Sequence, residues 1–232
     1  MNQLPWKQHY PSDVPAELAP VPFEHLPAMV KAATTTYAKT IAFTQVMPNG
    51  MNGSLTYAQV DELSDSFATY LREVLELKQG ARVAVQMPNC LAYPIVAFGI
   101  LKAGCILVNT NPLYTAPEMA YQFSDSGAEA LVVIDMFADR LDEVLAKTQI
   151  KNVVTVKISE FFPPVIAGVI RGVQRYWSRT LPKINVQHTW FQDALAEGKK
   201  RKNSANLESY LNGVTPDSIA ALQYTGGTTG VS

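Results

Sequence analysis

Short apolar runs alternate with helical patterns along most of this chain, and this alternation limits the fold more than any other feature of the sequence. The runs are rich in Val, Ile, Leu and Ala, which is typical of strands that are buried on both faces. They lie at residues 82–86, 105–109, 130–134, 152–156 and 219–224. Strands separated by helices predict βαβ units, so we expect an α/β fold with a mostly parallel sheet flanked by helices.

Two helix starts carry a capping signature, in which a hydroxyl residue is followed three positions later by an acid or amide that can bond back. The pairs are Thr56 with Gln59 and Thr115 with Glu118. We expect a long helix after Thr56 and a shorter one after Thr115. Asn89 is expected to cap a third helix, over residues 90–103.

The first part of the chain differs in composition from the rest. Proline recurs along residues 1–27, which we expect to form an extended N-terminal arm lying on the body. Residues 28–232 are expected to form one α/β subdomain, and 47% hydrophobic residues are enough for its core. A net charge of -1 with 17% charged residues provides no strong field for a nucleic-acid backbone, which argues against a nucleic-acid partner.

The terminal and apolar segments give an expectation about location. The N-terminus has no apolar run after a basic start, and no run approaches the ~20 apolar residues that cross a bilayer. We therefore expect a cytoplasmic protein. Cys90 and Cys105 lack a second thiol or a histidine at metal-ligand spacing and are expected to be buried, free thiols.

The segment from Phe161 to Leu181, and residues 163–181 above all, departs from the α/β rhythm. At about 100° per residue, apolar residues from Ile166 to Trp177 fall on one side and Arg171, Arg175 and Arg179 on the other. Two interpretations stay open. The helix either buries its apolar stripe in the core, or lies in the interface of the inner membrane face with its arginines meeting anionic lipid.

Two charged clusters are expected to be solvated. The basic run 199–202 is interpreted as a polar loop, with contact to a charged membrane as the second interpretation. Asp61, Glu62 and Asp65 are interpreted as the solvated face of a helix. The chain's histidines are too scattered to define a triad or a metal site, so we assign them no chemical role.

Residues 224–232 form a loop of glycine and hydroxyl residues after the predicted strand 219–224. Its members are Tyr224, Thr225, Gly226, Gly227, Thr228, Thr229, Gly230, Val231 and Ser232. Glycine lets successive backbone N–H groups converge on an anion, and a loop leaving such a strand is where open α/β sheets bind ligands. No lysine follows at P-loop spacing, and glycine content alone equally fits a mobile turn.

This loop resembles the phosphate-binding signature of the adenylate-forming enzymes, which include acyl-CoA synthetases, luciferase and adenylation domains. Further stretches are similar to the N-terminal half of bacterial long-chain fatty-acid CoA ligases. They lie at residues 9–15, 83–89, 98–104, 109–115 and 125–128. The resemblance covers nearly the whole chain and is weakest over residues 158–212.

The resemblance implies a chemistry and roles for the loop. In the family, ATP and a fatty acid give acyl-adenylate and pyrophosphate, and the CoA thiol then displaces AMP. Gly226, Gly227 and Gly230 would cradle the phosphates, Thr228 and Thr229 would donate hydroxyls, and Thr225 would be a Mg²⁺ ligand. Family members usually have Ser or Thr where Gly226 stands, so one hydroxyl donor is missing here.

The resemblance also leaves alternatives. In the family, the adenine pocket, the ribose-binding aspartate and a C-terminal lid follow this loop, so we expect no ligase turnover from residues 1–232 alone. Another acyl- or aryl-CoA ligase of the same family is the alternative within enzymes, and a noncatalytic membrane- or protein-binding module is the alternative outside them. Family members also pair through their N-terminal domains, which predicts a homodimer without identifying its surface.

Overall fold

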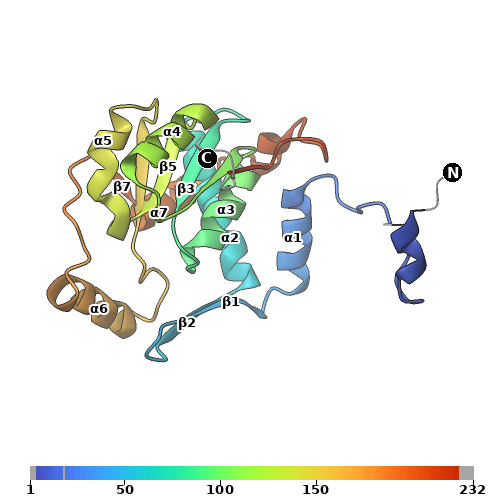
Figure 1. The fold of residues 1–232 in the computed structure, drawn as a ribbon, viewed down its shortest axis with the longest axis horizontal. Helices are drawn as coiled ribbons and strands as arrows, with labels where there is room; N and C mark the ends of the chain where they lie inside the picture. The colour runs from blue at the N-terminus through green and yellow to red at the C-terminus, as the bar shows by residue number, and fades with distance from the viewer. Residues whose placement is uncertain (1–3, 18, 225–232) are drawn as a thin grey trace.

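The computed structural model describes residues 4–17 and 19–224. Its centre is a six-stranded sheet with the order β7-β6-β5-β3-β4-β8, in which every pairing is parallel (Figure 1). The strands are β3 (Arg82–Gln86), β4 (Ile106–Thr110), β5 (Ala130–Ile134), β6 (Asn152–Val156), β7 (Thr189–Trp190) and β8 (Ala221–Gln223). The expected parallel α/β sheet is confirmed.

Helices cover both faces of this sheet. One face carries α2 (Tyr57–Thr69), α3 (Ala92–Lys102) and α7 (Phe191–Lys202), and the other carries α4 (Ala116–Ser126) and α5 (Leu141–Leu145). Successive side chains of a strand point to opposite faces, so Val83 and Val85 pack toward α3 whereas Ala84 packs toward α4.

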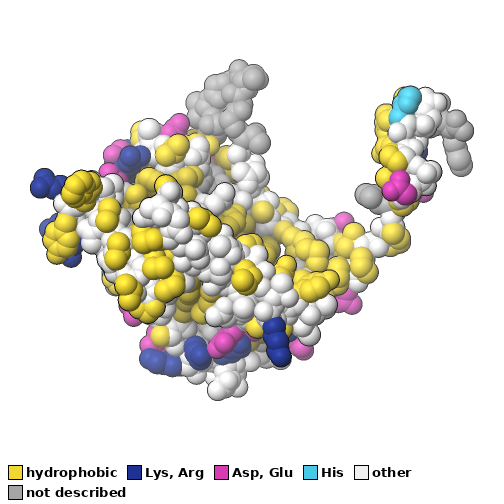
Figure 2. All heavy atoms as spheres, turned by 90° about the horizontal axis from the view of Figure 1, so that it is seen from below, with side chains coloured by type: hydrophobic (Ala, Val, Ile, Leu, Met, Phe, Trp, Pro, Cys, Tyr) yellow, Lys and Arg dark blue, Asp and Glu magenta, His cyan; other side chains and the backbone are white. Residues whose placement is uncertain are grey.

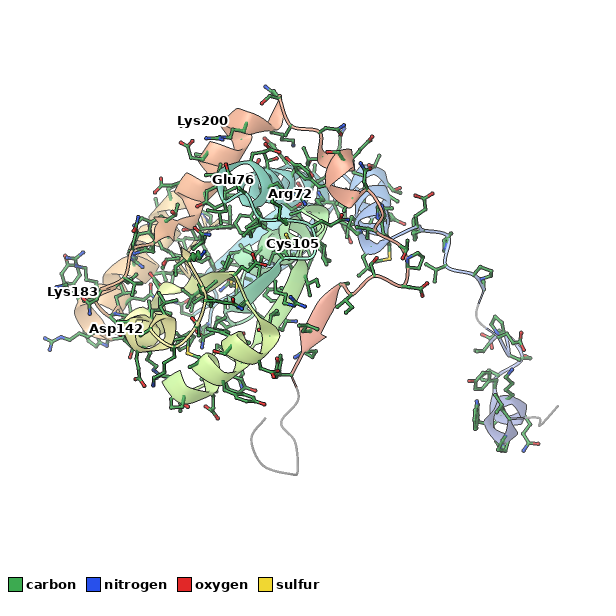
Figure 3. All side chains as sticks on the ribbon, turned by 90° about the horizontal axis from the view of Figure 1, so that it is seen from above. Arg72, Glu76, Cys105, Asp142, Lys183 and Lys200 are labelled. Atoms are coloured by element: carbon green, nitrogen blue, oxygen red, sulfur yellow. The ribbon has the colours of Figure 1, made fainter. Side chains whose placement is uncertain are left out.

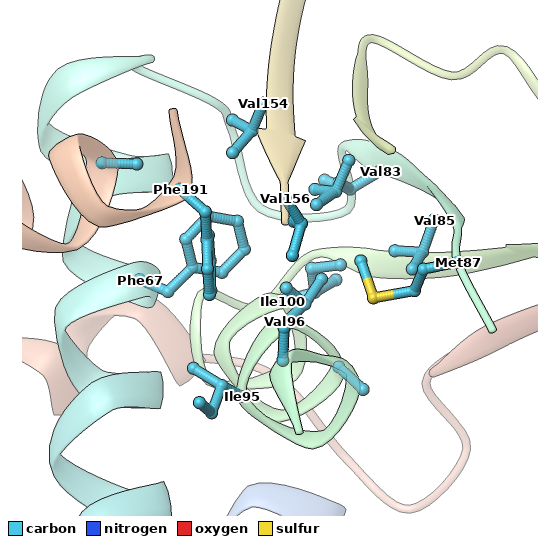
Figure 4. Packing of buried hydrophobic residues seen from close by; sticks show 14 of the residues in the cluster. Phe67, Val83, Val85, Met87, Ile95, Val96, Ile100, Val154, Val156 and Phe191 are labelled. Carbon is cyan, nitrogen blue, oxygen red and sulfur yellow. The ribbon is translucent and has the colours of Figure 1, made fainter. Parts of the chain in front are cut away.

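The larger core lies on the face of α2, α3 and α7. Figure 4 shows Phe67 of α2 and Phe191 of α7 packed beside Val154 and Val156 of β6. The two rings meet edge to face with centroids 5.2 Å apart. Cys90 and Cys105 are buried and free, as expected, and burial raises the pKa of the Cys105 thiol to about 12.

Both capping signatures form. The Gln59 backbone N–H donates to Thr56 Oγ1 at 3.3 Å, and Thr56 N–H donates back to Gln59 Oε1 at 2.8 Å. Thr115 N–H likewise donates to Glu118 Oε2 at 2.7 Å. A short π-helix, η2 (Tyr70–Val74), continues α2.

The expected cap of the third helix is wrong. α3 begins after Leu91 and not after Asn89, and no side chain caps it. The Leu91 N–H instead donates to Gln45 Oε1 at 3.1 Å, a residue 46 positions earlier in β1 (Ile41–Val46). The side chain of Gln45, which is distant in sequence, therefore accepts a backbone N–H at the start of this helix, a role that the local sequence predicted for Asn89.

The segments before α2 lie outside the main sheet. η1 (Pro5–His9) buries no side chain and stands away from the body, whereas α1 (Leu26–Thr36) packs beside α2 (Figure 1). β1 and β2 (Asn52–Thr56) form an antiparallel hairpin below these helices. The arm was expected to be extended and to lie on the body, but its first part forms a short helical turn away from the body, and only its later part reaches the body.

Two expectations about the C-terminal part need correction. Strand 219–224 was expected to be buried, but β8 pairs only with β4 among the described strands, and Ile219 before it is 62% exposed. The basic run 199–202 is the last turn of α7 and not a loop. Two of its cations pair with carboxylates of α2, since Lys199 lies 2.9 Å from Glu62 and Lys202 lies 2.9 Å from Asp65.

Of the three acids on α2 that were expected to be solvated, Glu62 is exposed, but Asp61 and Asp65 are largely covered. Lys102 of α3, itself 7% exposed, donates to Asp61 and to Asp65, each at 2.7 Å. Burial opposes the charge on Asp61, but the bonds from Lys102 and Lys31 outweigh it and hold its pKa below the usual range. These ion pairs join α2 to its helical neighbours.

The amphipathic segment 163–181 shares its apolar residues between core and solvent. α6 (Pro164–Gly172) is followed by a π-helix, η4 (Val173–Trp177), so the helical part is shorter than expected. Ile170 is buried, but Tyr176 and Trp177 are 77% and 88% exposed. The expected single apolar stripe is therefore divided, because only one edge of it reaches the core.

Candidate functional site

The order in which strands are added to the sheet reverses at β3: β4 lies on one side of it, and the next strand in the sequence, β5, lies on the other. After β3 the chain enters α3 on one face, and after the neighbouring β4 it enters α4 on the opposite face. At such a point the two connections diverge and leave a crevice at the carboxyl ends of the strands, which is where ligands bind in open α/β sheets. β8 adjoins β4, so its carboxyl end borders the same crevice.

A cavity of about 410 Å³ occupies this position. Its walls come from the ends of β3, β4 and β8 and from the turns that follow them. They are lined by Val85, Met87, Asn89, Tyr93, Asn109, Thr110, Asn111, Tyr114, Gln223 and Tyr224. Amide and hydroxyl groups provide the polar part of this lining, and none of these side chains carries a charge at neutral pH.

A larger groove of about 780 Å³ lies elsewhere. It runs between the end of the arm, at Val21 and Phe23, and residues 212–220, and it reaches the sheet at Ile106, the first residue of β4. This is the amino edge of the strands, and the lining is mainly apolar. The smaller crevice at the carboxyl edge is therefore the better candidate for a polar ligand.

Hydrogen bonds tie three elements together across the crevice. Tyr93 of α3 donates its hydroxyl to Asn109 Oδ1 at 2.8 Å, and Asn109 Nδ2 donates to Gln223 Oε1 at 2.9 Å. Asn109 thus holds α3 on one side and β8 on the other. A branched apolar residue in its place would keep the strand pairing but lose both bonds.

Two buried glutamines support the end of β4 from the other face. Gln122 Nε2 donates to the Asn109 carbonyl at 2.8 Å, and Gln86 Nε2 donates to the Asn111 carbonyl at 3.4 Å. Oε1 of each glutamine is buried without a protein partner among the described residues. Neither glutamine was predicted from the sequence, because its only signal is a polar side chain inside an otherwise apolar strand or helix face.

Tyr224 connects the crevice to the predicted phosphate loop. It lines the cavity, and its hydroxyl donates to the carboxylate of Asp125 in α4. Burial, followed by the bond to Asp125, raises the pKa of Tyr224 to about 12, so the phenol stays protonated at neutral pH. Of the predicted loop, Tyr224 is described, whereas Thr225, Gly226, Gly227, Thr228, Thr229, Gly230, Val231 and Ser232 lie outside the described residues.

The described part of the chain offers no preformed metal site. No group of three or more His, Cys, Asp or Glu within residues 4–17 and 19–224 could hold a metal ion. Nor is any helix of that part long and apolar enough to cross a bilayer. His25 instead caps α1, where its Nδ1 accepts the Ala28 N–H at 3.0 Å.

Relatives of known name align with almost the whole chain. The chain is 39% identical over 227 residues to a long-chain-fatty-acid–CoA ligase of Yersinia pestis, and 37% identical over 227 residues to one of Salmonella typhimurium. Each alignment covers 98% of this chain and 39% of the relative. The chain therefore spans about 39% of the length of these curated relatives.

Solved structures share the fold. An anthranilate CoA ligase in complex with anthranoyl-AMP superposes with a TM-score of 0.62 at 17% identity, covering 91% of this chain and 34% of that one. A long-chain-fatty-acid-CoA ligase from Archaeoglobus fulgidus gives a TM-score of 0.59 at 22% identity, covering 90% of this chain and 35% of that one. At these identities the likeness concerns the fold alone.

A family comparison agrees with the alignments. The sequence model of the family described as AMP-binding enzyme matches residues 30–232, which is most of the chain. The match includes the strands that form the crevice and the glycine and threonine loop after β8. By this match, the chain belongs to the AMP-binding enzyme family.

Proposed function

We propose that this chain provides the triphosphate loop and one wall of the substrate site of a long-chain fatty-acid CoA ligase. Relatives of that name align with 98% of the chain, which supports the proposal. The observation that carries it is the position of Tyr224. This first residue of the loop lines the crevice at the switch between β3 and β4, so the loop leaves the sheet where ligands of such folds bind.

In this proposal the loop and the crevice bind different parts of the substrates. Backbone N–H groups of Gly226, Gly227 and Gly230 and hydroxyls of Thr228 and Thr229 bind the phosphates of ATP. The uncharged crevice receives uncharged polar parts of the substrates, for which its amides and hydroxyls are suitable partners. ATP supplies the leaving pyrophosphate for acyl-adenylate formation, and CoA supplies the thiol that then displaces AMP.

We place Mg²⁺ at the phosphates, with Thr225 as its protein ligand. Another acyl- or aryl-CoA ligase of the family is the alternative. A homodimer remains a prediction of the resemblance.

Calorimetric titration with MgATP tests the loop. Gly227→Ala places a methyl group where the phosphate would approach, and we expect it to weaken ATP binding by about tenfold or more. Gly168→Ala is the matched control, since a Cβ there meets no atom within 4 Å. Equal ATP affinity of the native chain and the Gly227→Ala variant would contradict the proposal.

The substrate class needs a separate measurement. Mass spectrometry of the CoA thioesters made from oleate, octanoate and benzoate by the ligase that contains this chain would separate long-chain from short-chain or aryl specificity. We expect oleoyl-CoA as the main product. Benzoyl-CoA as the main product would favour the alternative.

The exposed stripe on α6 and η4 supports a second proposal, peripheral contact with a membrane on its cytoplasmic face. Val169 and Val173 lie one helical turn apart, are each 49% exposed, and are followed by Tyr176 and Trp177. Co-sedimentation with phosphatidylcholine vesicles should be lost in a Val169→Glu/Val173→Glu variant. Equal sedimentation of the native chain and the variant would remove this proposal.

A further inference from the structure

A second polar pocket lies at the edge of the sheet opposite to β8. It has a volume of about 450 Å³ and is formed by α6, η4, the segment before β7, and the end of β5. Its charged and aromatic lining consists of Asp135, Arg171, Arg175, Lys183, His188 and Trp190. The pocket borders the ends of β5 and β7, whereas the crevice of the candidate site borders the ends of β3, β4 and β8, and the two share no lining residue.

The pocket carries an excess of positive charge. Arg171 is bound to the carboxylate of Asp135, which is the pocket's one acid. Arg175 and Lys183 have no carboxylate within 4.0 Å among the described residues. Lys157 adds a further cation, since its Nζ lies 4.7 Å from the centroid of the Trp190 ring. Two exposed cations that line a pocket are a suitable site for a phosphate group.

The buried carboxylate of Asp135 indicates a second property of the ligand, a hydrogen-bond donor. Asp135 is 2% exposed, and its Oδ1 is buried without a partner within the described residues. Burial raises its pKa despite the bond from Arg171. An unpaired buried acceptor costs free energy until a donor reaches it. A ligand that brings a hydroxyl group next to its phosphate would supply this donor.

The size and walls of the pocket indicate more than a bare ion. A volume of about 450 Å³ lies within the range of small-molecule sites, about 300–1,000 Å³, and a single phosphate would fill only part of it. Trp190, Leu181 and Ile184 provide apolar surface beside the cations. Figure 3 shows Lys183 at one outer end of the molecule, and Figure 2 shows basic and hydrophobic side chains gathered at the end where α6 lies.

We propose that this pocket binds a small soluble phosphate monoester that carries a hydroxyl group, with Arg175 and Lys183 holding the phosphate and Asp135 accepting from the hydroxyl. Arg171 is a positioning residue, because it fixes the Asp135 carboxylate. None of the residues that line this pocket lines the crevice beside Tyr224, and the proposal does not depend on ligase activity.

Calorimetric titration with glycerol 3-phosphate tests the proposal. We expect saturable binding, weaker binding of methyl phosphate because it lacks a hydroxyl, and still weaker binding of inorganic phosphate. Arg175→Gln/Lys183→Gln should reduce the affinity for glycerol 3-phosphate by about tenfold or more, since both exposed cations are lost without disturbing the core. Lys39→Gln/Lys78→Gln removes the same charge elsewhere on the surface and should leave it unchanged.

Three outcomes would overturn the proposal. The first is equal affinity of both double variants, because the binding would then follow net charge alone. The second is equal affinity for all three ligands. The third is binding to phosphatidylcholine vesicles containing phosphatidic acid without binding to glycerol 3-phosphate, which would assign the pocket to a lipid headgroup. Glycerol 3-phosphate binding should persist in Gly227→Ala, so failure of the ATP loop and failure of this pocket are distinguishable.

Discussion

Asn109 of β4 donates from Nδ2 to Oε1 of Gln223 in β8 at 2.9 Å, across 114 positions of sequence. This bond fastens the last described strand to the sheet beside the crevice. Because Tyr93 donates to Oδ1 of the same asparagine, one side chain aligns α3, β4 and β8. The direction in which the chain leaves β8 toward the glycine and threonine loop therefore depends on Asn109.

Asn109→Ala should loosen β8 and weaken MgATP binding. The variant loses two side-chain hydrogen bonds, which predicts a loss of about 1–3 kcal/mol in the free energy of unfolding. Urea unfolding and MgATP titration measure the two effects. Asn152→Ala, at the amino end of β6, is the control. An equal ATP affinity of both variants would show that ATP binding does not depend on the bond between Asn109 and Gln223.

Gly198→Ala should destabilise the chain by about 3 kcal/mol. A Cβ at Gly198 of α7 would lie 1.9 Å from the carbonyl oxygen of Ser66 in α2, so the two helices would have to move apart. Gly168→Ala in α6 meets no atom and should be neutral or stabilising by about 0.5–1 kcal/mol. Thermal unfolding of the two variants compares them directly, and similar melting temperatures would refute the close approach.

Lys102→Met should destabilise the chain far more than Lys199→Met. Lys102 is buried between Asp61 and Asp65, and its removal takes one bond from each carboxylate, which leaves Lys31 as the partner of Asp61 and Lys202 as that of Asp65, at a cost of about 3 kcal/mol. Lys199 pairs with Glu62 at the surface, where such a pair contributes less than about 1 kcal/mol. Chemical unfolding at neutral pH measures both, and equal losses would contradict this difference.

The same ion pairs predict that the free energy of unfolding decreases at acid pH. The pKa of Asp61 is lower in the folded chain than its usual value of 3.8, so its contribution is present above that pH and is lost as the pH falls through the folded-state pKa. The difference in unfolding free energy between the native chain and Asp61→Asn should therefore shrink below about pH 4. A difference that stays constant from pH 7 to pH 3 would contradict this.

Tyr224→Phe should remove one tyrosine hydroxyl that ionises only at a pH well above the usual tyrosine pKa. The pKa of Tyr224 is raised to about 12 by burial and the bond to Asp125, so its protonated form is favoured by folding. That contribution is present below the ordinary tyrosine pKa of 10.0 and is lost as the pH rises through about 12. Ultraviolet difference titration of native and variant chains measures it, and a phenol that ionises near pH 10 would refute the bond to Asp125.

Sequence patterns predicted strands and helix starts well where all the residues that form the pattern are close together in the sequence. The bounds of β3, β5 and β6 match the predicted runs, because buried strands need continuous apolar residues. The two capping boxes formed because both partners lie within one turn. Asn89 failed as a cap because Gln45, distant in sequence, reached the same backbone.

The site was only partly predictable. The glycine and threonine motif identified the loop, but its residues beyond Tyr224 lie outside the described residues, so their roles remain predictions. Asn109 and Gln86 gave little local signal, since an isolated polar residue in a strand has many explanations. Their role emerged once β4 was placed between β3 and β8.

The sequence by itself determined most of the central strands and the helices between them, that the sheet is parallel, and which family the loop resembles, because these follow from side-chain periodicity and short motifs. Only the tertiary structure decided that β8 is an outer strand, that Lys199 and Lys202 of α7 pair with α2, and that the stripe of α6 is divided between core and solvent. Strand order and helix partners depend on contacts between distant residues, and no local period encodes them.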